Sequence, residues 1–190
     1  MATADVALVQ GIAEALGPAW VARLDARRGW SADVVRKDGA SIWLGFRDPG
    51  RVEAMGSFPS VGSEDFGPHH RDRVKISCAV SRGPVAIARD IQARLLPWYE
   101  TAYREALERQ DKRLADQLWE DRTALDLAEV SGCDVERLQW QDGPRVPVRR
   151  GDVFGTFAVS SYDQRITIEL RRVPVDVAHR IMALLMEVQQ

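Results

Sequence analysis

Apolar and polar residues follow two different periods along the first half of the chain. Within residues 3–16 apolar side chains recur every three or four positions, which predicts a helix that a Gly-Pro pair ends. Over residues 30–58, and again over 73–80, they alternate with polar ones, which is typical of strands. An Asp-Gly turn signal at positions 38–39 predicts a hairpin inside this region.

The alternation assigns each side chain to one face of the predicted sheet. Ile42, Leu44 and Phe46 are in phase and should point into the core, whereas Trp43 points to the opposite face. A helical pattern that begins at Pro84 follows the last run. The first half therefore reads α-β-β-β-β-α.

The end of this first half returns at the end of the chain. Residues 74–96 and 164–186 align without a gap, and eight of the twenty-three pairs are identical, where about one or two are expected from average residue usage. After Pro84 and Pro174 the shared apolar positions recur at helical spacing, so the same sites should face a sheet in both copies. The repeat thus specifies a core.

This internal repeat predicts an α+β fold made of two α-β-β-β-β-α units, residues 1–97 and 98–190. Such an order favours antiparallel sheets that carry helices on one face. Ile91 and Ile181 should then lie in matching surroundings. The second copy has four alternating runs and a second turn signal, Asp142-Gly143: residues 135–141, 145–150, 152–160 and 164–172.

A long helix should open the second unit. Pro97 is expected to end or kink the preceding helix near Leu96, because proline cannot donate the helical hydrogen bond. A helical pattern then runs to about residue 130, with its stripe made by Leu107, Leu114, Leu118 and Leu125. A coiled coil is an alternative, but Asp111 and Asp121 interrupt the heptad and favour a helix packed on its own domain.

Composition narrows the classes of function. The net charge of −2 argues against bulk attraction to nucleic acid or to an anionic membrane. No stretch approaches the roughly 20 apolar residues of a membrane span, and the N-terminus lacks the basic region of a signal peptide. Cys78 and Cys133 are expected to be buried or half-buried thiols. A cytoplasmic protein without a membrane partner is the prediction.

Catalytic motifs are absent from the sequence, so no catalytic residue and no cofactor is assigned. The segment 64–72 holds Glu64, Asp65, His69, His70 and Asp72, residue types that could bind a divalent metal or transfer protons. Adjacent histidines in an extended loop project in opposite directions, which works against shared ligation. A solvated loop is the preferred interpretation, and a metal-dependent enzyme is an alternative.

The sheet face opposite the helices is the candidate binding surface. By alternation it carries basic and aromatic or apolar side chains from both units: Trp43, Arg47, Met55, Lys75, Arg137, Arg145, Arg149, Phe154 and Arg165. Basic groups among aromatic rings suit stacking of single strands or a minor-groove saddle. A half-apolar face equally suits a protein partner or a second copy, and Glu53 and Glu169 dilute its positive charge. Protein binding is the leading hypothesis and nucleic-acid binding the alternative.

The run RVKISCAVSRGPVAIARDIQARLLPWY, residues 73–99, resembles uncharacterised proteins of actinobacteria and of their phages and plasmids. Those proteins share a strand, a turn like SRGP and a helix like ARDI..RLLP. The resemblance implies an accessory or mobile-element protein that acts by binding, and it implies no activity.

Overall fold

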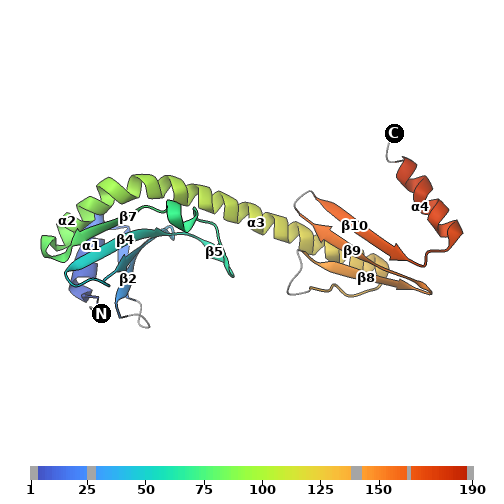
Figure 1. Ribbon diagram of the computed structural model, residues 1–190, viewed down its shortest axis with the longest axis horizontal. Coiled ribbons are helices and arrows are strands. Elements are labelled where there is room, and N and C mark those ends of the chain that lie inside the picture. The colour runs from blue at the N-terminus through green and yellow to red at the C-terminus, as the bar shows by residue number, and fades with distance from the viewer. Residues whose placement is uncertain (1–3, 25–28, 138–142, 162–163, 188–190) are drawn as a thin grey trace. The chain divides into compact units, whose positions relative to one another are not determined.

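The computed structural model describes residues 4–24, 29–137, 143–161 and 164–187. The chain forms two compact units, Met1–Asp111 and Lys112–Gln190. Both combine helices with antiparallel sheets, so the predicted α+β class is confirmed (Figure 1).

The first unit contains a five-stranded antiparallel sheet. Its strands, in spatial order, are β1 (Trp20–Leu24), β2 (Ser31–Arg36), β3 (Ser41–Gly45), β4 (Arg51–Ser57) and β7 (Lys75–Ala79). β5 (Ser60–Val61) and β6 (Glu64–Asp65) form a separate small hairpin. Asp38 and Gly39 make the predicted turn between β2 and β3, where Gly39 has a φ of 92° that few other residues adopt.

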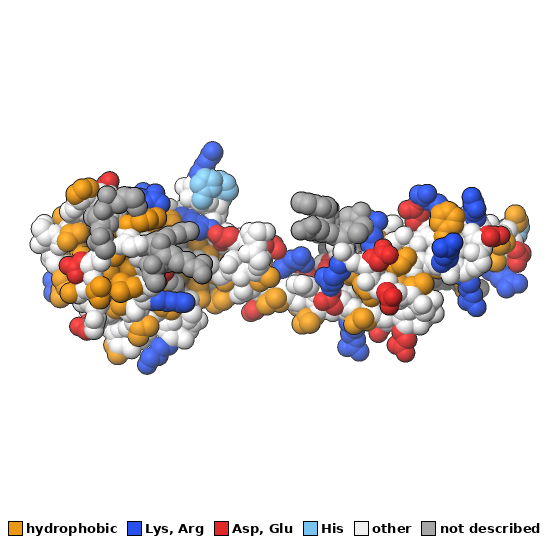
Figure 2. Space-filling view, turned by 90° about the horizontal axis from the view of Figure 1, so that it is seen from below, with side chains coloured by type: hydrophobic (Ala, Val, Ile, Leu, Met, Phe, Trp, Pro, Cys, Tyr) orange, Lys and Arg blue, Asp and Glu red, His pale blue; other side chains and the backbone are white. Residues whose placement is uncertain are grey.

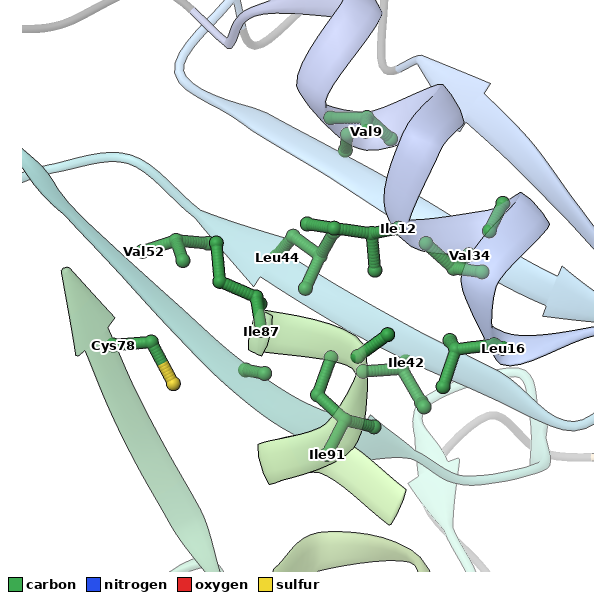
Figure 3. Packing of buried hydrophobic residues seen from close by; sticks show 14 of the residues in the cluster. Val9, Ile12, Leu16, Val34, Ile42, Leu44, Val52, Cys78, Ile87 and Ile91 are labelled. Atoms are coloured by element: carbon green, nitrogen blue, oxygen red, sulfur yellow. The ribbon is translucent and has the colours of Figure 1, made fainter. Parts of the chain in front are cut away.

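Two helices cover one face of this sheet, α1 (Val6–Leu16) and α2 (Gly83–Asp90). The Asp5 side chain caps α1 by accepting hydrogen bonds from the backbone N–H groups of residues 7 and 8. In Figure 3, Ile12 of α1 and Ile87 of α2 lie over the sheet beside Leu44 and Val52. The alternation predicted for β3, β4 and β7 is confirmed, because every second side chain enters this core.

Of the two outcomes predicted at Pro97, an end of the helix near Leu96 is wrong, because the helix that starts at Gly83 continues past it with an irregular turn just before Leu96. A π-helical turn, Ile91–Leu95, follows α2 and leads directly into α3 (Leu96–Ser131). The Leu96 N–H donates to the Ile91 carbonyl five residues back. This wider turn leaves room for the proline ring. It also tolerates the missing hydrogen bond, since proline has no N–H to donate.

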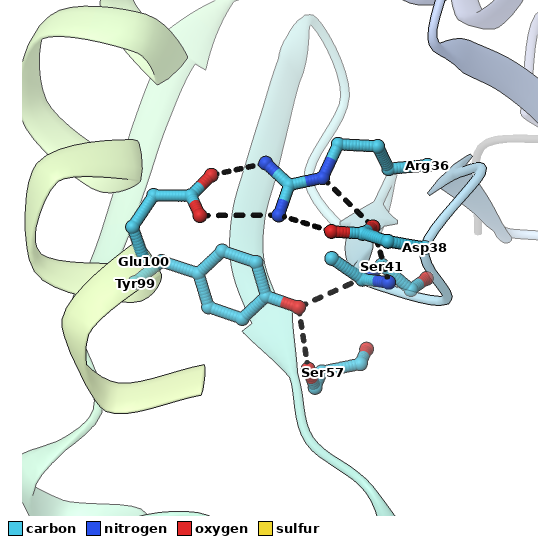
Figure 4. A network of polar contacts seen from close by, with 7 residues as sticks. Arg36, Asp38, Ser41, Ser57, Tyr99 and Glu100 are labelled. Carbon is cyan, nitrogen blue, oxygen red and sulfur yellow. Dashed lines mark hydrogen bonds and ion pairs between the residues drawn. The ribbon is translucent and has the colours of Figure 1, made fainter. Parts of the chain in front are cut away.

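A polar network fixes the start of α3 to the β2–β3 hairpin (Figure 4). Arg36 at the end of β2 makes ion pairs with Glu100 of α3 and with Asp38 of the turn. The Tyr99 hydroxyl donates to the Ser57 carbonyl at 2.8 Å and accepts from the Ser41 N–H at 2.9 Å. The hydroxyl therefore joins the ends of β3 and β4 to the helix.

The predicted leucine stripe of the long helix is not a packed stripe. Leu114, Leu118 and Leu125 are exposed, by 40%, 71% and 62%. The buried apolar positions of α3 are instead small or aromatic and fall into two groups, one near its start at Tyr99 and one at Ala124. The division of the chain into its two compact units falls inside this helix, between residues 111 and 112, and the copy boundary at 97/98 stays a prediction.

The second unit has a smaller, three-stranded antiparallel sheet. The order is β10 (Arg165–Arg171), β9 (Val153–Ser160) and β8 (Arg145–Arg150), and α4 (Val175–Glu187) follows. Ala124 of α3 packs on Val146 and Val159 to form its core. The strand predicted at 135–141 and the turn at Asp142-Gly143 fall largely outside the described residues, and their described part shows only a bridge between Glu136 and Arg145.

The predicted repeat of four-stranded units is not shown. Among the described residues the main sheets of the two units have five strands and three, because the sequence pattern missed β1 and because the run at 135–141 forms no described strand. Both copies of the repeated phrase do form a strand followed by a helix. Their surroundings differ, however: Leu95 is fully buried and Leu185 is 56% exposed, while Ile91 is buried and Ile181 is only partly so.

Candidate binding surfaces

The open face of the five-stranded sheet contains a groove of about 610 Å³. Four of the predicted face residues line it together: Trp43, Arg47, Met55 and Lys75. Trp43 of β3, Met55 of β4 and Lys75 of β7 are direct cross-strand neighbours, so they form a row across three strands. We call this feature the sheet-face groove.

Aromatic side chains form one end of the sheet-face groove. The rings of Trp30 and Trp43 meet edge to face with centroids 5.9 Å apart. The Arg47 guanidinium lies 4.5 Å from the centroid of Trp30 and 5.9 Å from that of Trp43. The Trp43 ring also covers Gly45, where an added Cβ would come within 2.1 Å of the ring. A glycine at this position is therefore what allows the tryptophan to lie along the sheet.

Two cations of the sheet-face groove, Lys75 and Arg73, are paired with carboxylates. Lys75 Nζ lies 2.9 Å from Glu53 Oε1, and Arg73 donates to Asp65 at 2.5 Å. Burial would raise the pKa of Asp65, but the bonds from Arg73 and from the Gly67 N–H together hold that pKa below its usual range. The groove therefore offers apolar rings and compensated charges, and no uniformly positive floor.

The loop at 64–72 contributes only its edge to the groove, through Asp65 and His70. His69 and His70 are both exposed, and His69 Nδ1 accepts from the Arg71 N–H at 3.4 Å. Over the described residues, no group of three or more His, Cys, Asp or Glu side chains is placed to hold a metal ion.

The second sheet gathers part of the predicted face. The cross-strand register puts Arg145, Arg149, Phe154 and Arg165 on one side, opposite the core residues Val146 and Val159. Arg149 and Phe154 are direct neighbours and line a hollow of about 450 Å³.

Two further arginines change the expected picture of this second face. Arg172, which the sequence reasoning did not assign, places its guanidinium 5.7 Å from the Phe154 centroid. Arg137 precedes β8 and forms an ion pair with Asp121 of α3. The register of β8, β9 and β10 therefore does not include Arg137, although it had been predicted on the same strand face.

Uncovered apolar side chains mark α4 and β10. No described side chain of α4 is buried, and eight large apolar side chains on the two elements are between 36% and 72% exposed: Ile166, Ile168, Val175, Val177, Met182, Leu184, Leu185 and Met186. The register places Ile166 and Ile168 on the side of the sheet that carries Val146 and Val159. Figure 2 shows apolar side chains among charged ones at the α4 end of the chain.

Three groove residues, Trp30, Phe58 and Arg73, were not among the predicted face residues. They lie within the alternating runs of the sequence but just outside the strands β2, β4 and β7, where the alternation no longer determines the face. The uncovered surface of α4 was also missed, because its helical stripe looks like that of α2, which is packed. Exposure of this kind depends on whether a partner layer exists, and periodicity does not reveal that.

Comparisons with family models, with curated proteins and with solved structures found no match. Within the described part of the chain, no helix is both long and apolar enough to cross a membrane.

Proposed function

We propose that this chain is a non-enzymatic, protein-binding accessory protein, and that α4 together with β10 is where a protein partner docks. The observation that carries the proposal is the exposure of eight large apolar side chains on these two elements. Apolar patches of this kind mark interaction sites in soluble proteins. A helix of 13 residues is marginal in water on its own, so α4 needs a packing partner for its stability.

The energy available at this surface is of the order that binding requires. Burying one large aliphatic side chain contributes about 1.5–3 kcal/mol. Eight side chains that are about half exposed would therefore contribute roughly 6–12 kcal/mol when covered. Association costs some 4–15 kcal/mol, so a partner must cover most of the surface to bind stably.

The charges on α4 and in the sheet-face groove favour a protein as the binding partner over a membrane or a nucleic acid. The polar positions of α4 include Asp176, His179 and Arg180, so the helix lacks the lysine- and arginine-rich face of membrane-surface helices. In the sheet-face groove, Glu53 and Asp65 would meet a phosphate backbone with negative charge. A second protein surface can match such mixed charges.

The proposal also includes the location of the protein, the descent of its two units and its origin. The free thiols Cys78 and Cys133 support a cytoplasmic location, since reducing compartments keep cysteines unpaired. The shared strand-then-helix order of the repeated phrase supports descent of the two units from one copied module. The resemblance of residues 73–99 supports an origin in a bacterium or its mobile elements.

The test is capture of a partner from the native host by the full chain and by one double variant. Leu184→Asp with Leu185→Asp places two charges on the uncovered surface, and we expect capture to fall at least tenfold while the far-UV circular dichroism is unchanged. Leu118→Asp is the matched control, because Leu118 is 71% exposed and belongs to α3, a different element. It should leave capture intact.

Two outcomes would overturn the proposal. One is equal capture by the double variant and the control. The other is binding of short single-stranded oligonucleotides that weakens steeply with salt and is lost in Lys75→Glu with Arg165→Glu, which would favour the nucleic-acid alternative.

A further inference from the structure

β1 forms an outer edge of the five-stranded sheet, and no described strand pairs with its second side. The Lys37 N–H donates to the Ala19 carbonyl at 3.1 Å, and the Arg36 N–H turns the other way, to Ala40 at 2.7 Å. Hydrogen-bonding partners alternate along an antiparallel ladder. Val21 and Arg23 therefore bond to β2, whereas Ala22 and Leu24 direct their backbone groups to the open edge.

This edge is apolar and carries few features that would prevent it from pairing with a strand of another chain. Val21 is 57% exposed, Leu24 45% and Val6 of the neighbouring α1 53%. Natural proteins usually protect such edges with lysine, proline or a bulge. β1 has the sequence WVARL, with Arg23 as its one charged residue, whereas β7 at the other edge begins with Lys75.

A hollow of about 410 Å³ lies beside the open edge, between α1 and β1. It is lined by Val6, Gln10, Ala13 and Glu14 of α1 and by Trp20, Val21, Ala22 and Leu24 of β1. Trp20 belongs to the core beneath the helices, so the alternate residues Ala22 and Leu24 point to the helix-covered side as well. The edge therefore exposes both backbone groups and a space for side chains.

We propose that β1 pairs antiparallel with β1 of a second copy of this chain, with Ala22 opposite Ala22 at a twofold axis. In this register Trp20 lies opposite Leu24. Every residue whose backbone groups point to the open edge therefore lies opposite another such residue. About four backbone hydrogen bonds form, because the Trp20 N–H is already bonded to the Gly17 carbonyl at 3.0 Å. Leu24 of the second copy enters the hollow beside Trp20, and the two sheets become one, with helices on the same face.

The area of this contact predicts a weak dimer. Five strand residues span about 17 Å. Across a strand and one helix layer, such an edge buries roughly 400–500 Å² per copy, compared with about 800 Å² in a standard interface. A dissociation constant on the order of 10–100 µM follows, so dimers form only at high concentration.

Sedimentation velocity of the full chain between about 1 and 300 µM tests the pairing. Wild type should shift from monomer to dimer across this range. Ala22→Pro removes an outward N–H, and Leu24→Lys places a charge in the hollow, so each should raise the dissociation constant at least tenfold. Val85→Lys is the matched control, since Val85 is an apolar residue of α2 that is 55% exposed, and it should dimerise as wild type does.

A disulfide cross-link tests the register independently of stability. Residues directly opposite in a hydrogen-bonded pair have Cα atoms about 5.5 Å apart, within the range that a disulfide spans. Ala22→Cys should therefore give a covalent dimer under mild oxidation. Val21→Cys, which would face Arg23, and wild type with Cys78 and Cys133 should not.

The outcomes separate this inference from the docking surface on α4. A chain that stays monomeric at 300 µM, or that forms dimers unaffected by both β1 variants, overturns the pairing. Dimers that dissociate only in the Leu184→Asp, Leu185→Asp variant would show that α4 itself binds a second copy. Loss of partner capture in that variant with β1 dimers retained would support both proposals.

Discussion

Tyr99 shows how one hydroxyl group can hold a helix against two strands. The side chain is fully buried, and its hydroxyl is bonded to the Ser57 carbonyl and to the Ser41 N–H. Replacing it with phenylalanine leaves both backbone groups without this partner inside the protein. Tyr99→Phe should therefore lower the free energy of unfolding by about 1–3 kcal/mol in urea titrations. Tyr103→Phe is the control and should change it little, since no hydrogen bond holds the Tyr103 hydroxyl in the described structure.

The same hydroxyl predicts a loss of stability in base. Burial raises the pKa of Tyr99 above its ordinary value of about 10, because the phenolate would lose its hydration. The unfolded chain then ionises first, so stability is complete below about pH 10 and falls as the pH rises above it. Wild type should lose more stability than Tyr99→Phe between about pH 9 and 11. An equal loss in both proteins would contradict this role of the hydroxyl.

At the scale of elements, close approach of β4 and α3 depends on Gly56. A Cβ built on this glycine would lie 2.1 Å from the Tyr99 ring, and the hydroxyl bonds keep that ring in place. Gly56→Ala should therefore destabilise the protein by about 1–3 kcal/mol through overpacking. The two sites should also be coupled, so that Gly56→Ala costs much less in a Tyr99→Ala background. Additive costs in a double-mutant cycle would argue against the clash.

The elements differ in how well they can be predicted from the sequence. β3, β4 and β7 could be predicted because one buried face imposes strict alternation, and that alternation also brought Trp43, Met55 and Lys75 together. β1 could not, since only Trp20 of its five residues is buried. Pro97 led to the wrong prediction of a helix end, because the π turn that accommodates it has no recognisable sequence pattern. The exposed side of α4 was hidden because a helical stripe reports amphipathicity, and it does not report whether a partner layer exists.

At the scale of the whole molecule, each compact unit has a separate apolar core. Nineteen buried residues, mostly from α1, α2, the π turn and the larger sheet, make one cluster, while the second unit is built around Ala124, Val146 and Val159. A fragment of residues 1–111 keeps the complete first core and the Tyr99 network. It should unfold cooperatively in urea, with an m-value in the range of about 1–3 kcal/mol/M for a small domain. Gradual, non-cooperative melting of the fragment would contradict this independence.

The π turn at Ile91–Leu95 has a consequence for how this chain can evolve. Its hydrogen bond closes over five residues, so the turn holds one residue more than an α-helical turn. Deleting one residue there would restore an α-helical turn and leave Tyr99 and Glu100 facing Ser57 and Arg36. A residue lost between Tyr99 and Tyr103 would instead rotate Tyr103 by about 100° away from Tyr99. Natural variants should consequently lose a residue at the π turn more readily than in the α-helical turns that follow it.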